Sequence, residues 1–586
     1  MLDYAYKHFV EKYILVKSQN NKGLTITFDQ MVSRIIDHQN KIPDYLRFGI
    51  KCVSLLFLLK NLFLQKKIEI DIPKARSSIF LLFKNLIRFH DSIFELANIN
   101  ENRIQNTNKS NLIPSNLKFD FIIIGSGPGG AVSARKLQES GFSTCILESG
   151  RIYSNDEISP FSYNEMLNYY KYSGVATTLG NANITYVEGA TVGGGSEINS
   201  GLYHRTPEHI LHHWGKEYAL IDSNSISLDK HFKTIEQNLC VSYFPDVEFS
   251  KASSMLDKGA KKLDWEVQEV PRWFKYDDTR TGSGVKMTMT KTYLKEYINN
   301  GGAVYQLTKV QSLKKQNGKW NVLFNTINGK KSVLAKNVIL SAGTIGTVQI
   351  LRKSGISKKA GKNFQMHPTI KVVAVFDEII NEEGMGVPVH QVKEFAPGYS
   401  FGCSISSKPY LRVAMLDHPE NISLVEEKWK NMAIYYSMIT PEGTGAIKNL
   451  PFFTDPLVTY NLTDRDKNNL AQGLKKLCKL LIIAGANTLY PSIKEGPVIK
   501  NINDINQLPE SIDTINTSLM TVHLFSSCPI GERKDRCVAD SFGKIFGQDG
   551  LFISDGSMLP SAPGVNPQGS IMAFAHRNIE KIIAEA

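Results

Sequence analysis

The sequence contains few cysteines, and their arrangement argues against two classes of protein. Only 7 of the 586 residues are Cys, and none forms a CxxC pair or has the spacing of a zinc site. The odd count and wide scatter favour a reducing compartment over a disulfide framework. No CxxCH motif for covalently attached haem is present. We therefore expect neither a metal centre nor a disulfide scaffold.

Long apolar runs are also missing, as is a secretory signal. The N-terminus, MLDYAYKHFVEKY, lacks the apolar core and cleavage site of a signal peptide. The longest strongly apolar stretch, residues 53–59, ends at Lys60 and is far shorter than the roughly 20 residues of a membrane-spanning helix. We expect a cytoplasmic protein, and peripheral contact with a membrane stays open as an alternative.

Charge of one sign is in excess. There are 68 Lys and Arg residues against 56 Asp and Glu, for a formal net charge of +12. Residues 1–117 hold 17 of the basic and 10 of the acidic residues, so a net +7 lies in one fifth of the chain. Such an excess permits attraction to anionic membranes or nucleic acid. Because no aromatic–basic stripe or nucleic-acid-binding motif accompanies it, we reject nucleic acid as a partner.

The first 97 residues predict a helical N-terminal extension. Apolar residues recur there at three- and four-residue spacing, and glycine is almost absent. Two stretches, SLLFLLKNLFL (54–64) and IFLLFKNLIRF (79–89), are apolar helices interrupted by Lys or Arg. Two hypotheses remain: the helices pack on the rest of the chain, or they insert into a lipid surface. Residues 98–118, rich in Asn and Ser, predict a linker.

A dinucleotide-binding pattern follows the linker. Residues 119–150 read FDFIIIGSGPGGAVSARKLQESGFSTCILESG, which predicts a strand, a glycine turn, a helix and a second strand. Gly125 permits the tight turn, Gly127 lets the backbone approach a pyrophosphate, and Gly130 lets the helix pack on the strand. The N–H groups of the first helical turn would bind the phosphates. Glu148 is placed to bind the ribose hydroxyls and disfavours the 2′-phosphate of NADP.

Two distant segments favour FAD over NAD. Residues 338–347, VILSAGTIGT, predict a buried strand that returns the chain towards the nucleotide. Residues 551–560, LFISDGSMLP, predict another strand, ending at Asp555. A nucleotide bound by segments scattered over more than 400 residues is typical of a large cofactor that is held permanently.

From Phe119 to its end, the chain resembles the glucose–methanol–choline (GMC) oxidoreductases. The stretch GATVGGGSEINSGLYHRTP (189–207) looks like the second flavin-binding stretch of that family, and GKNFQMHP (361–368) like one that borders the substrate domain. The resemblance implies that the backbone of Val310 holds the adenine. It also implies that five residues lie along the flavin: Gly193, Gly194, Gly195, Ser196 and Asn199.

The C-terminal region carries the most specific part of the resemblance. HLFSSCPIG (523–531) and DGSMLPSAPGVNPQGSIMAFAHR (555–577) match the family's pattern, except that two serines stand where Gly and Thr are usual. The resemblance implies that His523 and Asn566 form the catalytic pair and that Asp555 and Pro567 lie at the cofactor. Ile198 stands where some relatives link the flavin to a histidine, so we expect non-covalent FAD.

The chemistry of alcohol oxidation matches these residue types. The carbinol loses a hydride, which flavin N5 can take, and a proton, which a histidine such as His523 can accept. The amide of Asn566 can donate a hydrogen bond to the same oxygen. We therefore predict an FAD-dependent oxidase or dehydrogenase that converts an alcohol to an aldehyde or ketone. A flavin-containing lyase or a photodecarboxylase on the same fold is the alternative.

The expected fold is α/β (α+β overall), with a Rossmann-like FAD-binding domain and an interleaved mixed-sheet substrate domain. We expect the FAD domain to comprise residues 119–202, 301–376 and 517–586, and the substrate domain residues 203–300 and 377–516.

The choice of alcohol and of electron acceptor depends on weaker signals. FDQMVSRIIDHQNKIPDYLRF (28–48) is similar to the leader of long-chain alcohol oxidases, which implies a long-chain or sterol-like alcohol. Oxygen and other electron acceptors both stay open. We reject a metal site at EHILHHW, with His209, His212 and His213, because no carboxylate pattern accompanies it.

Overall fold

A computed structural model describes most of the chain. The residues that it describes are 1–20, 26–64, 87, 90–96, 118–153, 158–244, 250–276, 284–382 and 387–586. The predicted linker at 98–118 lies outside these residues except for Lys118, as does nearly all of the apolar stretch at 79–89.

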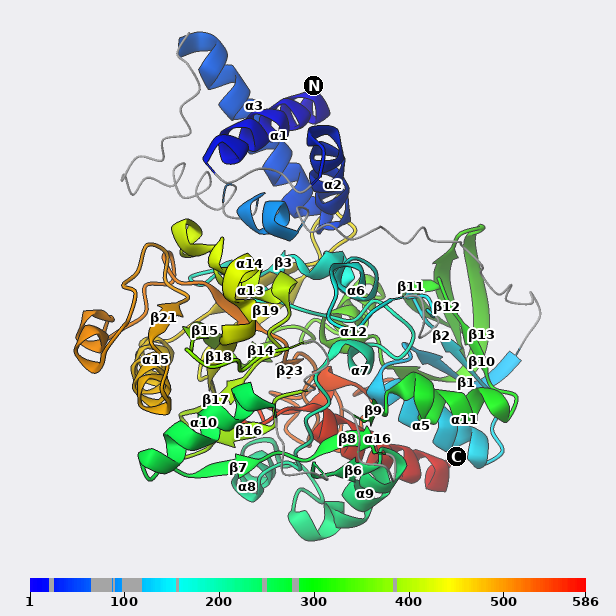
Figure 1. Cartoon of the computed structure of the whole chain (residues 1–586). Coiled ribbons are helices and arrows are strands. Elements are labelled where there is room, and N and C mark those ends of the chain that lie inside the picture. Colours follow the sequence, from blue (N-terminus) through cyan, green and yellow to red (C-terminus); the bar gives the residue numbers. More distant parts are fainter. Residues whose placement is uncertain are drawn as a thin grey trace.

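A seven-stranded sheet forms the half of the molecule that carries the dinucleotide motif (Figure 1). Its order is β10-β2-β1-β13-β12-β11, with β24 paired to β13. The strands are β1 (Lys118–Ile124), β2 (Thr144–Leu147), β10 (Ala303–Tyr305), β11 (Lys309–Gln316), β12 (Lys319–Thr326), β13 (Gly329–Leu340) and β24 (Leu551–Ile553). Strands β10, β2, β1, β13 and β24 pair in parallel, whereas β11 and β12 are antiparallel. The strands predicted at 121–124, 338–340 and 551–553 are confirmed.

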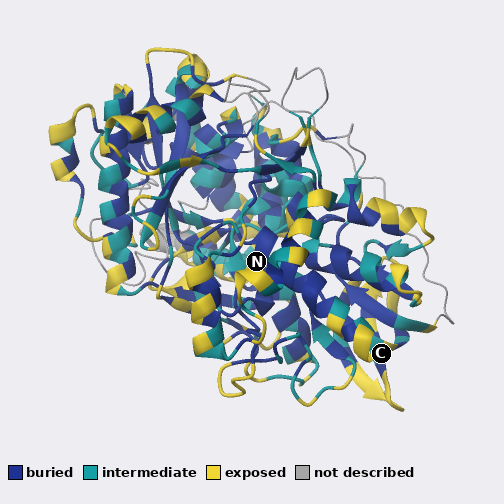
Figure 2. Cartoon of the chain, turned by 90° about the horizontal axis from the view of Figure 1, so that it is seen from below, coloured by how far each residue is buried: buried dark blue, intermediate teal, exposed yellow. Residues whose placement is uncertain are grey.

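Helices cover this sheet and complete the predicted strand–helix–strand unit. α5 (Pro128–Glu139) follows β1 and contacts both α16 (Gln568–Glu585) and α11 (Tyr293–Asn299), while α12 (Gly343–Lys353) follows β13. Parallel strands need such crossover helices, and the strands they cover read as continuous apolar runs. Figure 2 shows dark blue along most of the strands, and yellow on outer helix faces, on loops and on one strand end near the C-terminus.

A nine-stranded sheet forms the other half, in the order β3-β5-β22-β15-β18-β17-β16-β7 with β21 beside β15. Its strands are β3 (Ala176–Thr177), β5 (Ile184–Tyr186), β7 (Val267–Glu269), β15 (Thr369–Val375), β16 (His390–Val392), β17 (Tyr399–Cys403), β18 (Met432–Ile439), β21 (Thr488–Pro491) and β22 (Leu519–Thr521). α10 (Lys251–Lys262) and α15 (Asp464–Ala484) pack on it and on each other. These strands come from segments that we assigned to both domains, so the domain boundaries stay a prediction.

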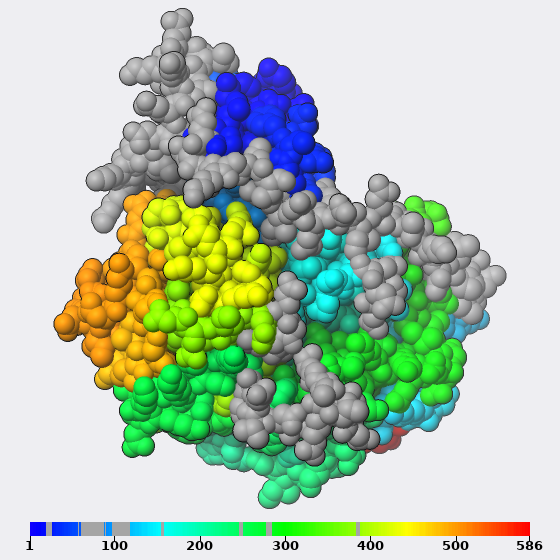
Figure 3. All heavy atoms as spheres, viewed as in Figure 1, coloured from blue at the N-terminus to red at the C-terminus, as the bar shows by residue number. Residues whose placement is uncertain are grey.

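Three N-terminal helices form a smaller unit that lies on the rest of the molecule (Figures 1 and 3). α1 (Leu2–Asn20), α2 (Phe28–Lys41) and α3 (Asp44–Leu64) share a core that includes Phe9, Ile14 and Ile35. His38 on α2 hydrogen-bonds the Tyr163 hydroxyl at 2.8 Å. This contact packs α2 on the chain, but it does not involve the apolar stretches 54–64 and 79–89, so the choice between packing and lipid insertion stays a prediction for them. None of the described helices is long and apolar enough to cross a membrane.

Candidate active site

In the glycine turn after β1, the packing of the protein requires two of the glycines, whereas the third faces open space. A methyl group on Gly125 would lie 2.1 Å from the Ser341 carbonyl oxygen, and one on Gly130 would lie 2.1 Å from the Gly125 carbonyl oxygen. At Gly127, the same methyl group would meet no protein atom within 4 Å. Gly127 is also the N-cap of α5, whose first turn has no side-chain cap. The open space and the uncapped N–H groups fit the pyrophosphate of FAD.

Glu148 lies directly beside this turn. Its carboxylate accepts hydrogen bonds from the Ser126 N–H at 2.8 Å, the Ser126 hydroxyl at 2.7 Å and the Gly150 N–H at 2.7 Å. The N–H of Thr308 donates to the Glu148 carbonyl, which holds the start of β11 alongside. Val310, buried and next to a β-bulge, follows on that strand. The contact at Thr308 thus brings the start of β11, two residues before Val310, to the backbone of Glu148, which fits a shared adenosine site.

The second glycine stretch packs against the first. A methyl group on Gly194 would lie 2.9 Å from the Gly127 Cα, and the Gly193 N–H donates to the Ser126 hydroxyl at 3.0 Å. Gly195 is exposed, and a methyl group there would meet nothing within 4 Å. The two stretches therefore leave an open strip that runs from Gly127 to Gly195 without side chains. A flat ring system such as the flavin fits a surface of this kind.

Polar groups hold the end of that stretch in place. The Ser196 hydroxyl donates to the Gly193 carbonyl at 2.9 Å, and the Asn199 amide donates to the side chain of Gln568 at 2.7 Å. Beneath it, the ammonium of Lys286 donates to the carbonyl oxygens of Glu197 and Asn199, both at 2.7 Å. Burial lowers the pKa of Lys286, and burial also raises the pKa of Glu197. Sequence reasoning missed Lys286, which lies far from the motif along the chain.

The carboxylate of Asp555 already accepts its hydrogen bonds from other groups of the protein. It accepts from the Gly343 N–H at 3.0 Å, the Thr347 hydroxyl at 2.5 Å, and the N–H and hydroxyl of Ser557 at 2.9 and 2.5 Å. Burial raises the pKa of this carboxyl. The side chain thus ties the end of β24 to α12. Its contribution to a cofactor would come from the backbone.

His523 and Asn566 meet although 43 residues separate them. His523 follows β22, Asn566 precedes α16, and His523 Nε2 lies 3.3 Å from Asn566 Nδ2. Both side chains are partly buried. Pro567 is the N-cap of α16, and no side chain caps this helix. The positive end of the α16 dipole therefore lies next to the pair, where it stabilises negative charge.

His367 is a third member that sequence reasoning did not assign. Its Nδ1 lies 3.1 Å from Nδ1 of His523, and its Nε2 accepts from the Gly564 N–H at 3.2 Å. Neutral His367 therefore carries its hydrogen on Nδ1 and donates it to His523. The signal available in the sequence was the position of His367 at the end of GKNFQMHP, a stretch already assigned to the substrate border.

This hydrogen bond decides which tautomer of His523 can act as a base. While His367 donates to Nδ1, neutral His523 holds its hydrogen on Nε2, opposite Asn566 Nδ2, which can only donate, so the Asn566 amide can bond to Nε2 only in the other tautomer. To accept a proton at Nε2, His523 must carry its hydrogen on Nδ1 and donate it to His367. His367 then carries its hydrogen on Nε2 and loses the bond from Gly564. The basicity of His523 is thus linked to the state of His367.

The imidazoles of the site are neutral at neutral pH. Burial, together with the positive charge of Lys393, lowers the pKa of His523 to about 4. Burial holds the pKa values of His367 and His204 well below the ordinary range. A neutral His523 is the form that can accept a proton.

Further polar groups surround the pair. The amide of Gln391, on β16, donates to Asn566 Oδ1 at 3.3 Å and to the Tyr436 hydroxyl at 3.4 Å. Gln391 also interacts with the ring of the buried His204, and this leaves at least one ring nitrogen of His204 without a hydrogen-bond partner among the described residues. Buried polar atoms are normally paired, so this side of the site fits a polar ligand. No local motif marks these residues, because only strand pairing brings them together.

Two other histidine groups do not form a second site. His209, His212 and His213 lie exposed on α8 (Glu208–Tyr218). Ligand atoms of His231, His576 and Glu580 lie within 4.8 Å of one another. Two lysine ammonium groups already pair with Glu580, at 3.0 and 3.5 Å, so the cluster is charge-balanced without a cation.

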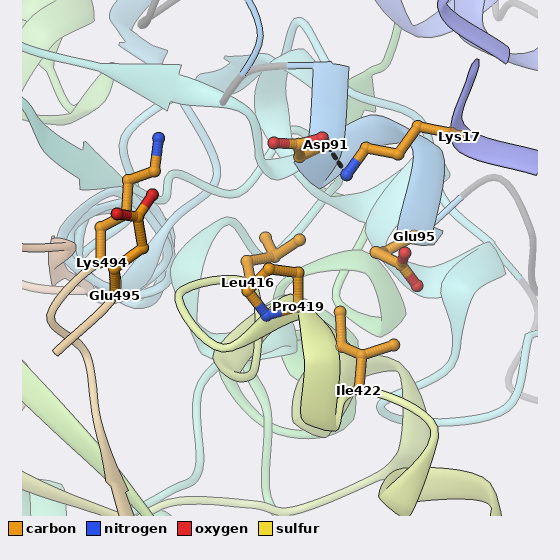
Figure 4. A pocket seen from close by; sticks show the side chains of 8 residues that line it. All are labelled: Lys17, Asp91, Glu95, Leu416, Pro419, Ile422, Lys494 and Glu495. Carbon is orange, nitrogen blue, oxygen red and sulfur yellow. Dashed lines mark ion pairs between the residues drawn. The ribbon is translucent and has the colours of Figure 1, made fainter. Parts of the chain in front are cut away.

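A shallow pocket elsewhere contains none of the site residues. It lies where the N-terminal helices meet the rest of the chain, and Figure 4 shows the Lys17–Asp91 ion pair on one side of it. It is lined by Lys17, Asp91, Glu95, Leu416, Pro419, Ile422, Lys494 and Glu495. Its mixed charges are typical of a solvated seam between two packed units.

Comparisons with known proteins agree with this geometry. Residues 119–369 and 452–575 match the N- and C-terminal family models described as GMC oxidoreductase. An uncharacterised GMC-type oxidoreductase, y4nJ of Sinorhizobium fredii, is 32% identical over 489 residues, covering 80% of this chain and 95% of that protein. Long-chain-alcohol oxidase FAO4A of Arabidopsis thaliana is 24% identical over 525 residues, covering 81% and 70%.

A solved structure is similar in fold. The crystal structure of pyridoxine 4-oxidase from Mesorbium loti aligns with a TM-score of 0.62 at 16% identity, covering 79% of this chain and 98% of that one. At this identity the likeness concerns the fold alone. It confirms the expected α/β class with a Rossmann-like cofactor domain.

Proposed function

The chain belongs to the GMC oxidoreductase family of flavoproteins, and we propose that it oxidises the CH–OH group of an alcohol to an aldehyde or ketone, with non-covalent FAD as cofactor. One observation carries the proposal: His523 Nε2 and the Asn566 amide lie 3.3 Å apart, so both can reach one substrate oxygen. A neutral base and an amide donor around one oxygen are what removal of a hydroxyl proton requires.

The open glycine strip supports the cofactor assignment. Gly127 and the N-terminus of α5 would hold the pyrophosphate, Glu148 the ribose, and the stretch from Gly193 to Asn199 the flavin. When bound, FAD supplies the acceptor for the hydride that leaves the carbinol carbon. Ile198 offers no nitrogen for a covalent link, which supports non-covalent binding.

The protein's own residues would handle the proton. His523 Nε2 accepts it, and the imidazolium formed attracts the alkoxide. The amide of Asn566 donates a hydrogen bond to that oxygen without changing its own charge. The N-terminus of α16, which begins directly after this pair, adds a positive dipole. The heavy atoms of these groups are already in place in the structure, and what must change first is the tautomer of His523 and His367.

The names of the relatives support an alcohol as substrate. Relatives named long-chain-alcohol oxidase and cholesterol oxidase favour an alcohol with a substantial carbon skeleton. Both are oxidases by name, which favours oxygen as the electron acceptor.

The test is an anaerobic panel of alcohols added to the purified flavoprotein. We expect an accepted alcohol to bleach the flavin absorbance, and His523→Gln to slow the bleaching by about 10²–10⁴-fold because the base is lost. His231→Gln is the matched control, since burial also lowers the pKa of His231 to about 4 but this residue lies outside the site. Bleaching at full rate by His523→Gln would contradict the assigned role.

The same panel tests the alternative reaction. If no alcohol bleaches the flavin while a fatty acid is consumed under light, or a cyanohydrin is cleaved, a photodecarboxylase or lyase would replace the oxidase. Admitting air after bleaching then tests oxygen as acceptor, because rapid recovery of the absorbance requires oxygen to reoxidise the flavin.

A further inference from the structure

Strand β16 presents two side chains towards the site. Gln391 reaches Asn566, whereas the ring of its neighbour His390 hydrogen-bonds Ser253 on α10, on the opposite side of the strand. Lys393 continues the strand, because its N–H donates to the Glu266 carbonyl at 2.9 Å and so extends the pairing with β7. Side chains alternate along a strand, which places Lys393 on the same side as Gln391.

The charge of Lys393 acts on the site. Its ammonium contributes to lowering the pKa of His523, of His367 and of His204. No carboxylate acts on His523 or His367 in the same way. Lys393 is therefore the charged group that these imidazoles share.

This ammonium has no counter-ion. Among the described residues, Lys393 Nζ takes part in no hydrogen bond or ion pair. The side chain is partly buried, and burial lowers its pKa to about 8, with Glu266 acting weakly in the opposite direction. A cation that is desolvated without a partner is costly, and such groups normally pair with an anion.

A neighbouring atom lacks a partner as well. The side chain of Gln391 interacts with the His204 ring, and one such contact leaves at least one ring nitrogen of His204 buried without a partner among the described residues. A ligand that completes this part of the site must therefore accept a hydrogen bond from the Lys393 ammonium. It must also donate or accept hydrogen bonds at the neighbouring side chains. A single ammonium matches a singly charged anion.

We propose that the substrate is an alcohol that also carries a carboxylate, which Lys393 binds while the carbinol lies at His523 and Asn566. This inference rests on the proposed function. Residues i and i+2 of a strand lie roughly 7 Å apart, so a spacer of a few carbon atoms separates the two groups of the substrate. The carbinol loses one hydride to FAD and one proton to His523 Nε2, yielding an oxo acid whose carboxylate is unchanged.

Binding is measured first, independently of turnover. The oxidised flavoprotein is titrated with hexanoate and with hexan-1-ol by calorimetry and by the flavin difference spectrum. We expect Lys393→Met to weaken hexanoate by about tenfold or more, and Lys393→Arg to retain most of the affinity because it keeps the charge. Hexan-1-ol should bind all three proteins alike. Lys371→Met is the control, since burial lowers the pKa of Lys371 to about 8 as well, but the charge of Lys371 does not act on the three imidazoles.

Turnover then separates anion binding from a general electrostatic role. Rates of anaerobic flavin bleaching by 6-hydroxyhexanoate and by hexan-1-ol are compared in each protein. We expect Lys393→Met to lower kcat/KM about tenfold or more for the hydroxy acid, mainly through KM, and to change it much less for the alkanol, for which only the effect of the charge on His523 is lost. An equal loss for both alcohols would overturn the proposal, because Lys393 would then stabilise the alkoxide.

The binding measurement tests the carboxylate site, and the bleaching measurement tests the proposed oxidation, so either proposal can be wrong without the other. Equal hexanoate affinity in the wild type and in Lys393→Met would remove the carboxylate site, even if alcohols bleach the flavin. Hexanoate binding that depends on Lys393 would support the site, even if no alcohol bleaches the flavin and the proposed oxidation is wrong.

Discussion

The cofactor side and the substrate side of the site are built in opposite ways. On the cofactor side, the polar side chains are already satisfied: the carboxylates of Glu148 and Asp555 both accept several bonds from the chain. What is left open is backbone, at Gly127 and Gly195. On the substrate side, polar side chains are only partly satisfied by the residues that the structure describes: one ring nitrogen of His204 and the ammonium of Lys393 have no partner there.

The difference reflects the ligands each side would hold. A large cofactor that is bound permanently is recognised by shape and by backbone N–H groups, and the residues around it can be fixed within the protein. A substrate that enters and leaves must supply hydrogen bonds that the protein lacks without it. If these assignments hold, the cofactor side is complete as protein structure, and the substrate side would be completed by its ligand.

We expect the largest effect from a substitution that disturbs the backbone on the cofactor side. Gly130→Ala places a methyl group 2.1 Å from the Gly125 carbonyl oxygen, so we expect loss of FAD and a lower melting temperature, or no folded protein. Gly127→Ala is the matched control, since its methyl group meets no protein atom within 4 Å. We expect this variant, freed of FAD, to melt as the wild type does but to bind FAD at least about tenfold more weakly. Equal FAD affinity would place the pyrophosphate elsewhere.

We expect the second largest effect on the substrate side, from the loss of one amide group. Asn566→Ala removes the donor that lies 3.3 Å from His523, and we expect anaerobic flavin reduction to slow by about 10²-fold because alkoxide stabilisation is lost. Rapid-mixing absorbance at saturating substrate measures it, and the flavin spectrum and melting curve verify that the cofactor side is intact. A change in KM alone would assign Asn566 to substrate binding.

A smaller effect concerns the pH profile. Because the pKa of His523 is lowered to about 4, the neutral base predominates above that value, so kcat/KM should be level above about pH 5 and fall tenfold per pH unit below about pH 4. His367→Gln removes the Nδ1–H donor and places an amide that can accept from His523 Nδ1. An amide oxygen that accepts from His523 Nδ1 stabilises the imidazolium form of His523, so we expect the pKa of His523 to rise. The fall of kcat/KM on the acid side of the profile should then begin at a higher pH. If the acid side of the pH profile does not move in His367→Gln, His367 does not control the pKa of His523.

The smallest effect is expected outside both sides. Leu56 and Leu59 on α3 are exposed, at 59% and 40%, so Leu56→Ser with Leu59→Ser should change the free energy of unfolding by less than about 1 kcal/mol and leave flavin reduction unchanged. If the N-terminal region contacts membranes peripherally, the same variant should cosediment less with anionic liposomes. Unchanged cosedimentation would remove this face as the point of contact.

Much of the cofactor side could be predicted because its signals are local. The strand, the glycine turn and the helix at 121–139 follow one another in the chain, and Glu148 follows at a regular distance. His523 and Asn566 could be named only through the resemblance to a family. Their partners Gln391 and Lys393 could not be assigned, because a glutamine or a lysine in or beside a strand carries no local sign of what it faces. For His367, the only signal was its position at the end of GKNFQMHP.

The sequence by itself determined the strand–helix–strand unit, the positions where only glycine fits, and the helical character of the N-terminal residues. Each of these depends on backbone conformation and on spacing over a few turns or strands. Only the tertiary structure decided that β16, β22 and the start of α16 converge, and therefore that His523, Asn566 and Lys393 act on one another. Strand pairing over long separations sets such contacts, and with them the tautomer, the pKa and the missing counter-ion of the site.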